Sequence, residues 1–128
     1  MASSISLAEL IGRGGVYYNI PGSNPVEALK EAVKAVSLPK ALDRDALLVA
    51  ILEREALMPT AIGNGVAIPH PRSPMLTDKS QQRVAAFFLK TPLPYSALDR
   101  KPVSTLFLLL SADAKSHLSI LASISYLC

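Results

Sequence analysis

Apolar positions in the first part of the chain change from a strand pattern to a helical one. Residues 16–20 form a short run of β-forming side chains, which predicts a strand. Asn24 then suits an N-cap, with Pro25 at the first helical position and Glu27 placed to close a capping box. The apolar stripe of the helix that we expect here repeats at helical spacing: Val26, Leu29, Val33 and Val36.

A second helix is predicted to begin after Asp43 and to run to about Leu57, where Met58-Pro59 ends it. The sequence Gly63-Asn64-Gly65 predicts a turn, followed by a short extended segment that contains His70. Residues 71–82 combine two prolines with polar side chains and are expected to form a loop.

Two aliphatic-rich segments in the second half of the chain predict strands at 83–90 and 103–111. Asp113 is expected to cap a helix from Ala114 towards Cys128. This alternation of strands and helices predicts an α/β domain, with helices packed on a sheet. The last helix has no C-terminal signal, so we expect the domain to lack a final helical segment.

Composition narrows the class of protein. The chain has 128 residues, of which 50% are hydrophobic, and this is enough for one core. No apolar run approaches the roughly 20 residues of a membrane span, and the N-terminus lacks the features of a secretory signal. The single cysteine, Cys128, cannot form an internal disulfide, so we expect a cytoplasmic protein. A net charge of +3 without basic clusters argues against nucleic acid as a partner.

His70 is one of two histidines and lies between Pro69 and Pro71. Neither proline can donate an amide hydrogen to a sheet, and Pro71 favours an extended backbone at His70. We therefore expect a stiff, locally unpaired segment that presents the imidazole to a partner. The plain alternative is a histidine on an ordinary surface loop.

His117 and Arg54 are both expected on the inward face of a helix. His117 shares its face with three apolar residues, and Arg54 follows the apolar stripe of the second predicted helix. The structural explanation for His117 is a buried histidine that is hydrogen-bonded. For Arg54 it is a salt bridge, or a side chain that snorkels out to water. The functional explanation is a phosphate site near a helix N-terminus, since a guanidinium matches phosphate geometry.

Together, these three side chains suit phosphoryl transfer. A neutral imidazole is a good nucleophile near neutral pH, because its ordinary pKa is about 6.5. Phosphoryl transfer depends on positioning and on charge stabilisation, which Arg54 and His117 would supply if they lie near His70. No metal or other cofactor is required for this reaction.

The chain resembles the enzyme IIA domain, type 2 (fructose, mannitol and nitrogen-regulatory class), of the bacterial phosphoenolpyruvate-dependent phosphotransferase system. The resemblance extends over nearly the whole chain, and its most specific part runs from Arg54 to His70. The matching stretches are Leu52-Glu53-Arg54-Glu55, Thr60 to His70, Tyr95-Ser96-Ala97-Leu98-Asp99, Lys101-Pro102-Val103 and His117 to Ala122.

This resemblance implies a mixed β-sheet flanked by helices on both faces, in a single domain spanning residues 1–128. It matches His70 to the phosphorylated histidine of the family, and Arg54 and His117 to its supporting residues. The implied donor is a histidine phosphocarrier protein. The implied acceptor is a IIB domain in sugar-transporting members, whereas nitrogen-type members regulate a target protein.

Pro71 departs from the family pattern, which usually has glycine after the active histidine. The change removes an amide donor that could face a phosphate. It motivates one alternative, a regulatory binding module with the same fold but no phosphoryl transfer. A metal site on His70 and His117 is a further alternative, but no typical ligand triad accompanies the two histidines.

Overall fold

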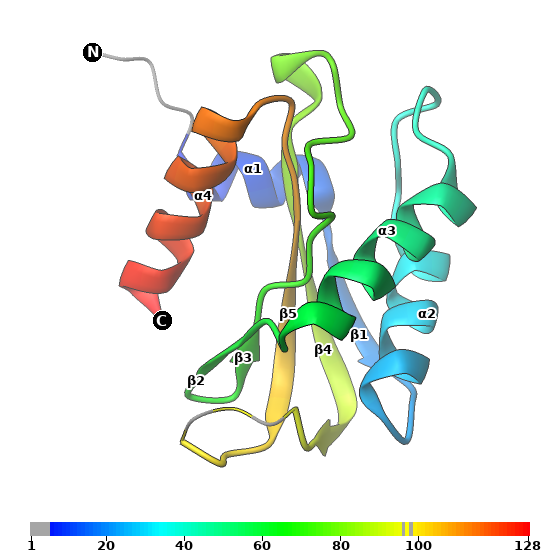
Figure 1. Cartoon of the computed structure of the whole chain (residues 1–128), viewed down its shortest axis with the longest axis vertical. Helices are drawn as coiled ribbons and strands as arrows, with labels where there is room; N and C mark the ends of the chain where they lie inside the picture. The colour runs from blue at the N-terminus through cyan, green and yellow to red at the C-terminus, as the bar shows by residue number, and fades with distance from the viewer. Residues whose placement is uncertain (1–5, 96, 98) are drawn as a thin grey trace.

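A five-stranded mixed sheet forms the centre of the protein, as the computed structural model shows for residues 6–95, 97 and 99–128 (Figure 1). The strands are β1 (Val16–Ile20), β2 (Ala61–Gly63), β3 (Val66–Ala67), β4 (Arg83–Leu93) and β5 (Val103–Leu110). Their order across the sheet is β1-β4-β5-β3-β2. The β1/β4 and β3/β5 pairs are parallel, whereas the β4/β5 and β2/β3 pairs are antiparallel.

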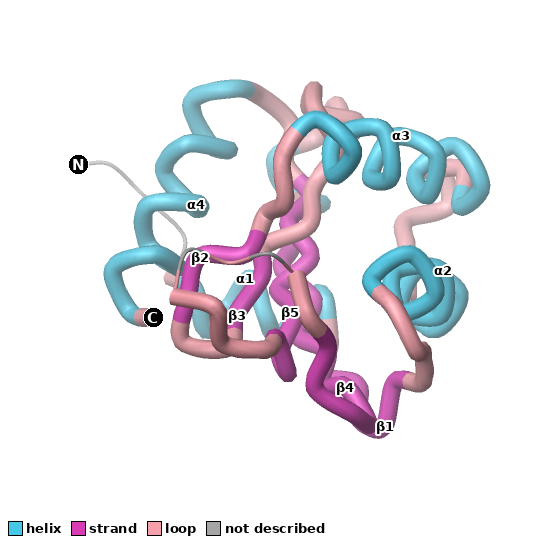
Figure 2. The backbone as a smooth tube through the Cα atoms, turned by 60° about the horizontal axis from the view of Figure 1, so that its bottom comes forward, coloured by secondary structure: helices cyan, strands magenta, loops and turns pink. Residues whose placement is uncertain are grey.

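Helices cover both faces of this sheet, as the resemblance implied. They are α1 (Leu7–Gly14), α2 (Pro25–Ala35), α3 (Arg44–Leu57) and α4 (Ala114–Leu127), and a short 3-10 helix, η1, spans Lys79–Gln81. α2 and α3 lie on one side of the sheet, whereas α1 and α4 lie on the other (Figure 1). The segment that follows β3 runs between α3 and α4 in both backbone views (Figure 2).

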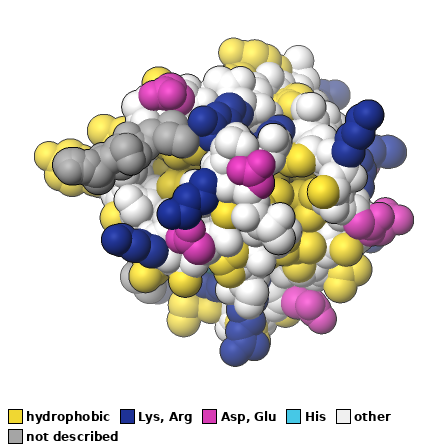
Figure 3. All heavy atoms as spheres, turned by 90° about the horizontal axis from the view of Figure 1, so that it is seen from above, with side chains coloured by type: hydrophobic (Ala, Val, Ile, Leu, Met, Phe, Trp, Pro, Cys, Tyr) yellow, Lys and Arg dark blue, Asp and Glu magenta, His cyan; other side chains and the backbone are white. Residues whose placement is uncertain are grey.

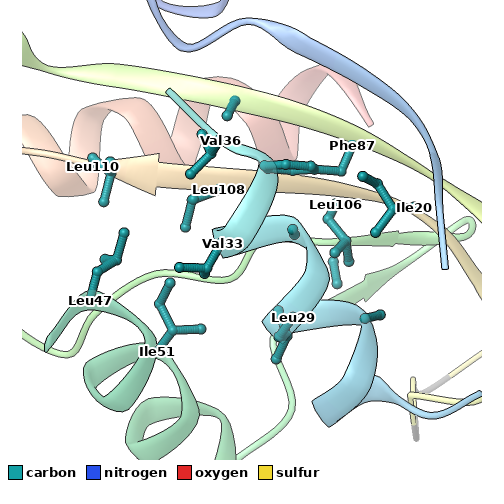
Figure 4. Packing of buried hydrophobic residues seen from close by; sticks show 14 of the residues in the cluster. Ile20, Leu29, Val33, Val36, Leu47, Ile51, Phe87, Leu106, Leu108 and Leu110 are labelled. Atoms are coloured by element: carbon teal, nitrogen blue, oxygen red, sulfur yellow. The ribbon is translucent and has the colours of Figure 1, made fainter. Parts of the chain in front are cut away.

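The larger core lies between the sheet and the α2/α3 pair. Leu29 and Val33 of α2 and Leu47 and Ile51 of α3 point towards Phe87 on β4 and the aliphatic side chains of β5 (Figure 4). Each of these five side chains is almost completely buried. Burial of one such side chain contributes roughly 1.5–3 kcal/mol, so this face holds α3, and with it Arg54, firmly against the sheet.

The smaller core joins α1 and α4 to the opposite face of the sheet. Its buried members are Leu10, Ile68, Val84, Leu109, Ile120 and Ile124. The helix α1 was not predicted from the sequence, because it is short and its end is rich in glycine. Gly14 is required there, since a Cβ atom at this position would lie 2.1 Å from the carbonyl oxygen of Val84.

The sequence predicted the other α-helices and the strands β1, β4 and β5, with two corrections in α2. It did not predict β2 or the 3-10 helix η1, which lies in the expected loop. Asn24 caps α2 by accepting a hydrogen bond from the amide of Glu27. Glu27 does not complete the expected box, because its carboxylate accepts from the amide of Ser23 instead of that of Asn24. Val26 is 48% exposed, so the buried face of α2 is formed by Ala28, Leu29, Ala32 and Val33. Asp113 caps α4 as predicted, and α3 begins directly after Asp43, as predicted, with Asp43 as its N-cap.

Some features of the sequence lie outside the described residues. These are the N-terminal segment Met1 to Ile5, and Ser96 and Leu98 in one stretch of the family resemblance. Within the described residues, no helix has both the length and the apolar character needed to cross a membrane. One face of the molecule mixes basic, acidic and hydrophobic side chains without a large patch of one charge (Figure 3).

Candidate functional site

His70 lies on the segment that follows β3, and this segment is tied to its neighbours on both sides. The amide of Ile68 donates to the carbonyl of Thr60 at 3.0 Å, and the amide of Leu109 on β5 donates to the carbonyl of Pro69 at 3.1 Å. The expectation of a locally unpaired segment is therefore wrong. Although Pro69 and Pro71 lack amide hydrogens, the carbonyl groups and the Ile68 amide make the connections to the sheet.

The His70 side chain is only 7% exposed, and its ring is held by a backbone carbonyl. Nδ1 lies 2.7 Å from the carbonyl oxygen of Ile68. A carbonyl oxygen can only accept a hydrogen bond, so Nδ1 carries the proton in the neutral ring. The lone pair of neutral His70 is therefore on Nε2, which makes Nε2 the nucleophilic nitrogen.

His117 lies in the first turns of α4 and faces His70. The two ring centroids are 4.8 Å apart and the ring planes are inclined at 55°. The backbone amide of His117 donates to the carbonyl of Asp113, the N-cap residue of α4, at 3.0 Å. His117 is half-buried, so it remains partly accessible to solvent.

Arg54 lies in the last turn of α3 and is also half-buried. One guanidinium nitrogen, Nη1, donates to the carbonyl of Met58 at 2.7 Å, which satisfies an otherwise free carbonyl at the helix end. The positive charge of Arg54 lowers the pKa of both His70 and His117. The structure therefore brings together all three side chains that the sequence singled out.

Burial is the main reason that the pKa of His70 lies below the ordinary value of 6.5. The Ile68 carbonyl opposes this shift by stabilising the protonated ring, whereas His117 and Arg54 add to it. Burial also lowers the pKa of His117, again with a contribution from Arg54. Both imidazoles are therefore neutral at pH 7, the state in which a histidine can act as a nucleophile.

Glu55 also belongs to this region, although the sequence patterns did not single it out. Glu53, on the other side of Arg54 in the sequence, is exposed. Glu55 is half-buried, and its carboxylate accepts hydrogen bonds from both the amide and the hydroxyl of Thr60. The sequence signal that could have indicated this contact is Thr60, a hydrogen-bond donor that lies five residues after Glu55 and just beyond the predicted helix end.

Pro71, which directly follows His70, is buried and so is not part of an exposed loop surface. Within residues 6–95, 97 and 99–128, no three histidine, cysteine or acidic side chains gather in a way that could hold a metal ion. The pair of His70 and His117 thus lacks the further ligands that a zinc site would need in this part of the chain. What His70 does offer is a nucleophilic nitrogen, with the positive charge of Arg54 acting on its ring.

Comparison with known proteins matches residues 10–128 to the family described as "Phosphoenolpyruvate-dependent sugar phosphotransferase system, EIIA 2". A nitrogen regulatory protein of Pseudomonas aeruginosa is 33% identical over 125 residues, which cover 94% of this chain and 79% of that protein. A fructose-specific EIIA component of Haloferax volcanii is 37% identical over 94 residues. That match covers 71% of this chain and 58% of the relative.

A solved structure shows the same architecture. The nitrogen regulatory protein IIA-Ntr of Neisseria meningitidis superposes with a TM-score of 0.72 at 27% identity, over 87% of this chain and 75% of that one. The sequence match extends over almost all the described residues, and the mixed sheet with helices on both faces agrees with it. On these grounds, the chain belongs to the EIIA 2 family of the phosphoenolpyruvate-dependent sugar phosphotransferase system.

Proposed function

We propose that the protein is a phosphoryl carrier that accepts a phosphoryl group on Nε2 of His70 from a histidine phosphocarrier protein. The observation that supports this most is the arrangement around His70. Its Nδ1 is hydrogen-bonded to the Ile68 carbonyl at 2.7 Å, and its ring centroid lies 4.8 Å from that of His117. Arg54 adds a positive charge that acts on both rings.

In the proposed transfer, the lone pair of Nε2 attacks the phosphorus of the donor phosphohistidine. A new N–P bond forms on His70 while the donor N–P bond breaks, and its electron pair returns to the donor imidazole. The proton on Nδ1 of His70 stays in place, so the ring becomes positively charged as the bond forms. The Ile68 carbonyl stabilises that charge, while Arg54 and His117 are available to stabilise the phosphoryl oxygens.

The phosphoryl group would then pass to a IIB domain or serve as a regulatory signal to a target protein. The similarity to nitrogen regulatory proteins favours the regulatory role, although a fructose-specific component is also similar. In either role the protein acts in the cytoplasm with other components of the phosphotransferase system, as a stoichiometric carrier and not as an independent catalyst.

The test is incubation of the protein with the general phosphotransferase components and labelled phosphoenolpyruvate. We expect the protein to gain about one acid-labile phosphoryl group per chain, because phosphohistidine is hydrolysed by acid. Omission of the histidine phosphocarrier protein is the control and should prevent labelling. Absence of label from the complete mixture would contradict the proposal.

The second candidate is a regulatory binding module that has the fold without the phosphoryl transfer. The burial of His70 and of Pro71 beside it favours this candidate, because a donor must reach Nε2. It predicts a partner that binds wild-type protein, His70→Ala and His70→Asp equally well. Under the carrier proposal, His70→Asp should alter the affinity, since it introduces negative charge where the phosphoryl group would lie.

The pH dependence of phosphorylation follows from the lowered pKa of His70. Since the neutral ring is the nucleophile, the rate should fall only on the acid side, with a midpoint below 6.5. Measurement of the rate from about pH 5 to 8, together with an NMR titration of His70, would check this. That range extends to both sides of the ordinary histidine pKa of about 6.5. A midpoint above 6.5 would contradict the burial of the neutral ring.

The same pKa shift affects stability. Below about pH 6.5 the unfolded chain binds more protons at His70 and His117 than the folded protein does, because both pKa values are lowered on folding. The contribution of the two histidines to the free energy of unfolding is therefore present above pH 6.5 and decreases as the pH falls towards their folded pKa values.

A further inference from the structure

Glu55 makes two hydrogen bonds to one residue at the beginning of the strand pair that leads to His70. One carboxylate oxygen accepts from the backbone amide of Thr60 at 2.7 Å, and the other accepts from the Thr60 hydroxyl at 2.8 Å. Thr60 is only 6% exposed. Hydrogen bonds to a charged acceptor in a partly buried place are among the stronger ones, so Thr60 is held in a defined position relative to the end of α3.

Two further hydrogen bonds connect Thr60 to the imidazole of His70. The carbonyl of Thr60 accepts from the amide of Ile68 at 3.0 Å. The carbonyl of Ile68 in turn lies 2.7 Å from Nδ1 of His70. A continuous series of bonds therefore leads from Glu55 through Thr60 and Ile68 to the imidazole.

We infer that Glu55 is a positioning residue, which fixes the ring orientation and the tautomer of His70 through Thr60 and Ile68. This inference rests on the proposed function, in which Nε2 of His70 is the nucleophile. Glu55 follows Arg54 directly in α3. One helical turn therefore supplies the positive charge of Arg54 and also anchors the segment that carries His70.

The chemistry of the transfer explains why this anchoring matters. When Nε2 bonds to phosphorus, the ring gains positive charge, and the Ile68 carbonyl is the group that faces the Nδ1 proton. If Thr60 shifts, Ile68 loses the hydrogen bond between its amide and the Thr60 carbonyl, and only the bond from Leu109 to Pro69 still holds the segment. The Ile68 carbonyl then moves relative to Nδ1, which weakens both the tautomer preference and the stabilisation of that charge. A displacement of about 1 Å can slow an enzymatic reaction about 100-fold.

Tyr95 provides a matched control near the same carboxylate. Its side chain is 3% exposed, and within the described residues its hydroxyl has no hydrogen-bond partner. Burial, together with the nearby Glu55 carboxylate, raises the pKa of Tyr95. Because the hydroxyl bonds to neither Glu55 nor Thr60, Tyr95→Phe should leave the positioning of His70 unchanged.

The experiment compares Glu55→Ala with Glu53→Ala and Tyr95→Phe. Glu53→Ala removes the same charge from an exposed position of α3, two residues away. Two quantities are measured: the rate of labelling from phosphoenolpyruvate, and the tautomer of His70 from its ring nitrogen NMR signals. We expect Glu55→Ala to be labelled about 10- to 100-fold more slowly and to lose the fixed Nδ1–H form. Both controls should retain the wild-type values.

Glu55→Gln keeps one acceptor oxygen and serves if Glu55→Ala does not fold. Its expected result is a smaller loss of rate with a mixture of His70 tautomers. Wild-type tautomer and rate in a folded Glu55 variant would overturn the inference. If wild-type protein takes up no label, the carrier function fails, whereas loss of the Nδ1–H form in the Glu55 variant still supports positioning by Glu55.

Discussion

His70→Gln is expected to take up no acid-labile phosphoryl group from labelled phosphoenolpyruvate. Glutamine is close to histidine in size but has no nucleophilic nitrogen, because the amide lone pair is delocalised. His70 is also buried beside Ile68, and the glutamine amide can still donate to that carbonyl, so the segment after β3 should keep its place. Labelling followed by acid treatment measures the loss directly.

His117→Gln is the matched variant for this experiment. The ring of His117 lies 4.8 Å from that of His70, so its removal should slow labelling without preventing it. Circular dichroism on both variants verifies that each retains the fold. Acid-labile label on His70→Gln would show that another residue is the acceptor.

Arg54→Ala is expected to slow phosphoryl transfer by about 100- to 1,000-fold, the usual cost of removing one charge-stabilising donor from such a site. The guanidinium provides positive charge beside both histidines, and two bonds from its planar fork fit a phosphoryl group. Single-turnover labelling with a saturating donor measures the chemical step apart from donor binding.

The effect of Arg54→Ala on folding should be much smaller. Among the described residues, the half-buried side chain makes one hydrogen bond, to the carbonyl of Met58, and loss of such a bond costs about 1 kcal/mol. Arg54→Lys should have an intermediate rate, because it keeps the charge but not the fork. A variant that is slow only because it has unfolded would favour a structural role for Arg54.

Local signals in the sequence were sufficient for most of the elements around the site. Asn24 and Asp113 were predicted as N-caps, and the second helix was predicted to begin after Asp43. Each of these three residues accepts a hydrogen bond from its own helix. The two long strands were expected from dense aliphatic runs, and β4 extends slightly beyond its predicted end. The helix α1 was missed, because its helical signal is short and ends in glycine residues that pack against the sheet.

The three side chains of the candidate site could be singled out from the sequence, but their geometry could not. Helical spacing placed Arg54 and His117 on inward faces, and the family resemblance joined them to His70. No local pattern could show that Ile68 and Pro69 are paired with Thr60 and β5, since those contacts depend on the sheet register. For the same reason, the sequence did not reveal the link between Glu55 and Thr60, which joins the end of α3 to the segment before β2.

The most direct test of the carrier proposal is to identify the phosphorylated atom. Protein labelled with ¹⁵N in its histidine rings would be phosphorylated from phosphoenolpyruvate and studied by phosphorus and nitrogen NMR. Because Nδ1 is hydrogen-bonded to the Ile68 carbonyl, we expect a phosphorus–nitrogen coupling at Nε2 of His70, with Nδ1 still protonated. A phosphoryl group on Nδ1 of His70, or on His117, would contradict the account.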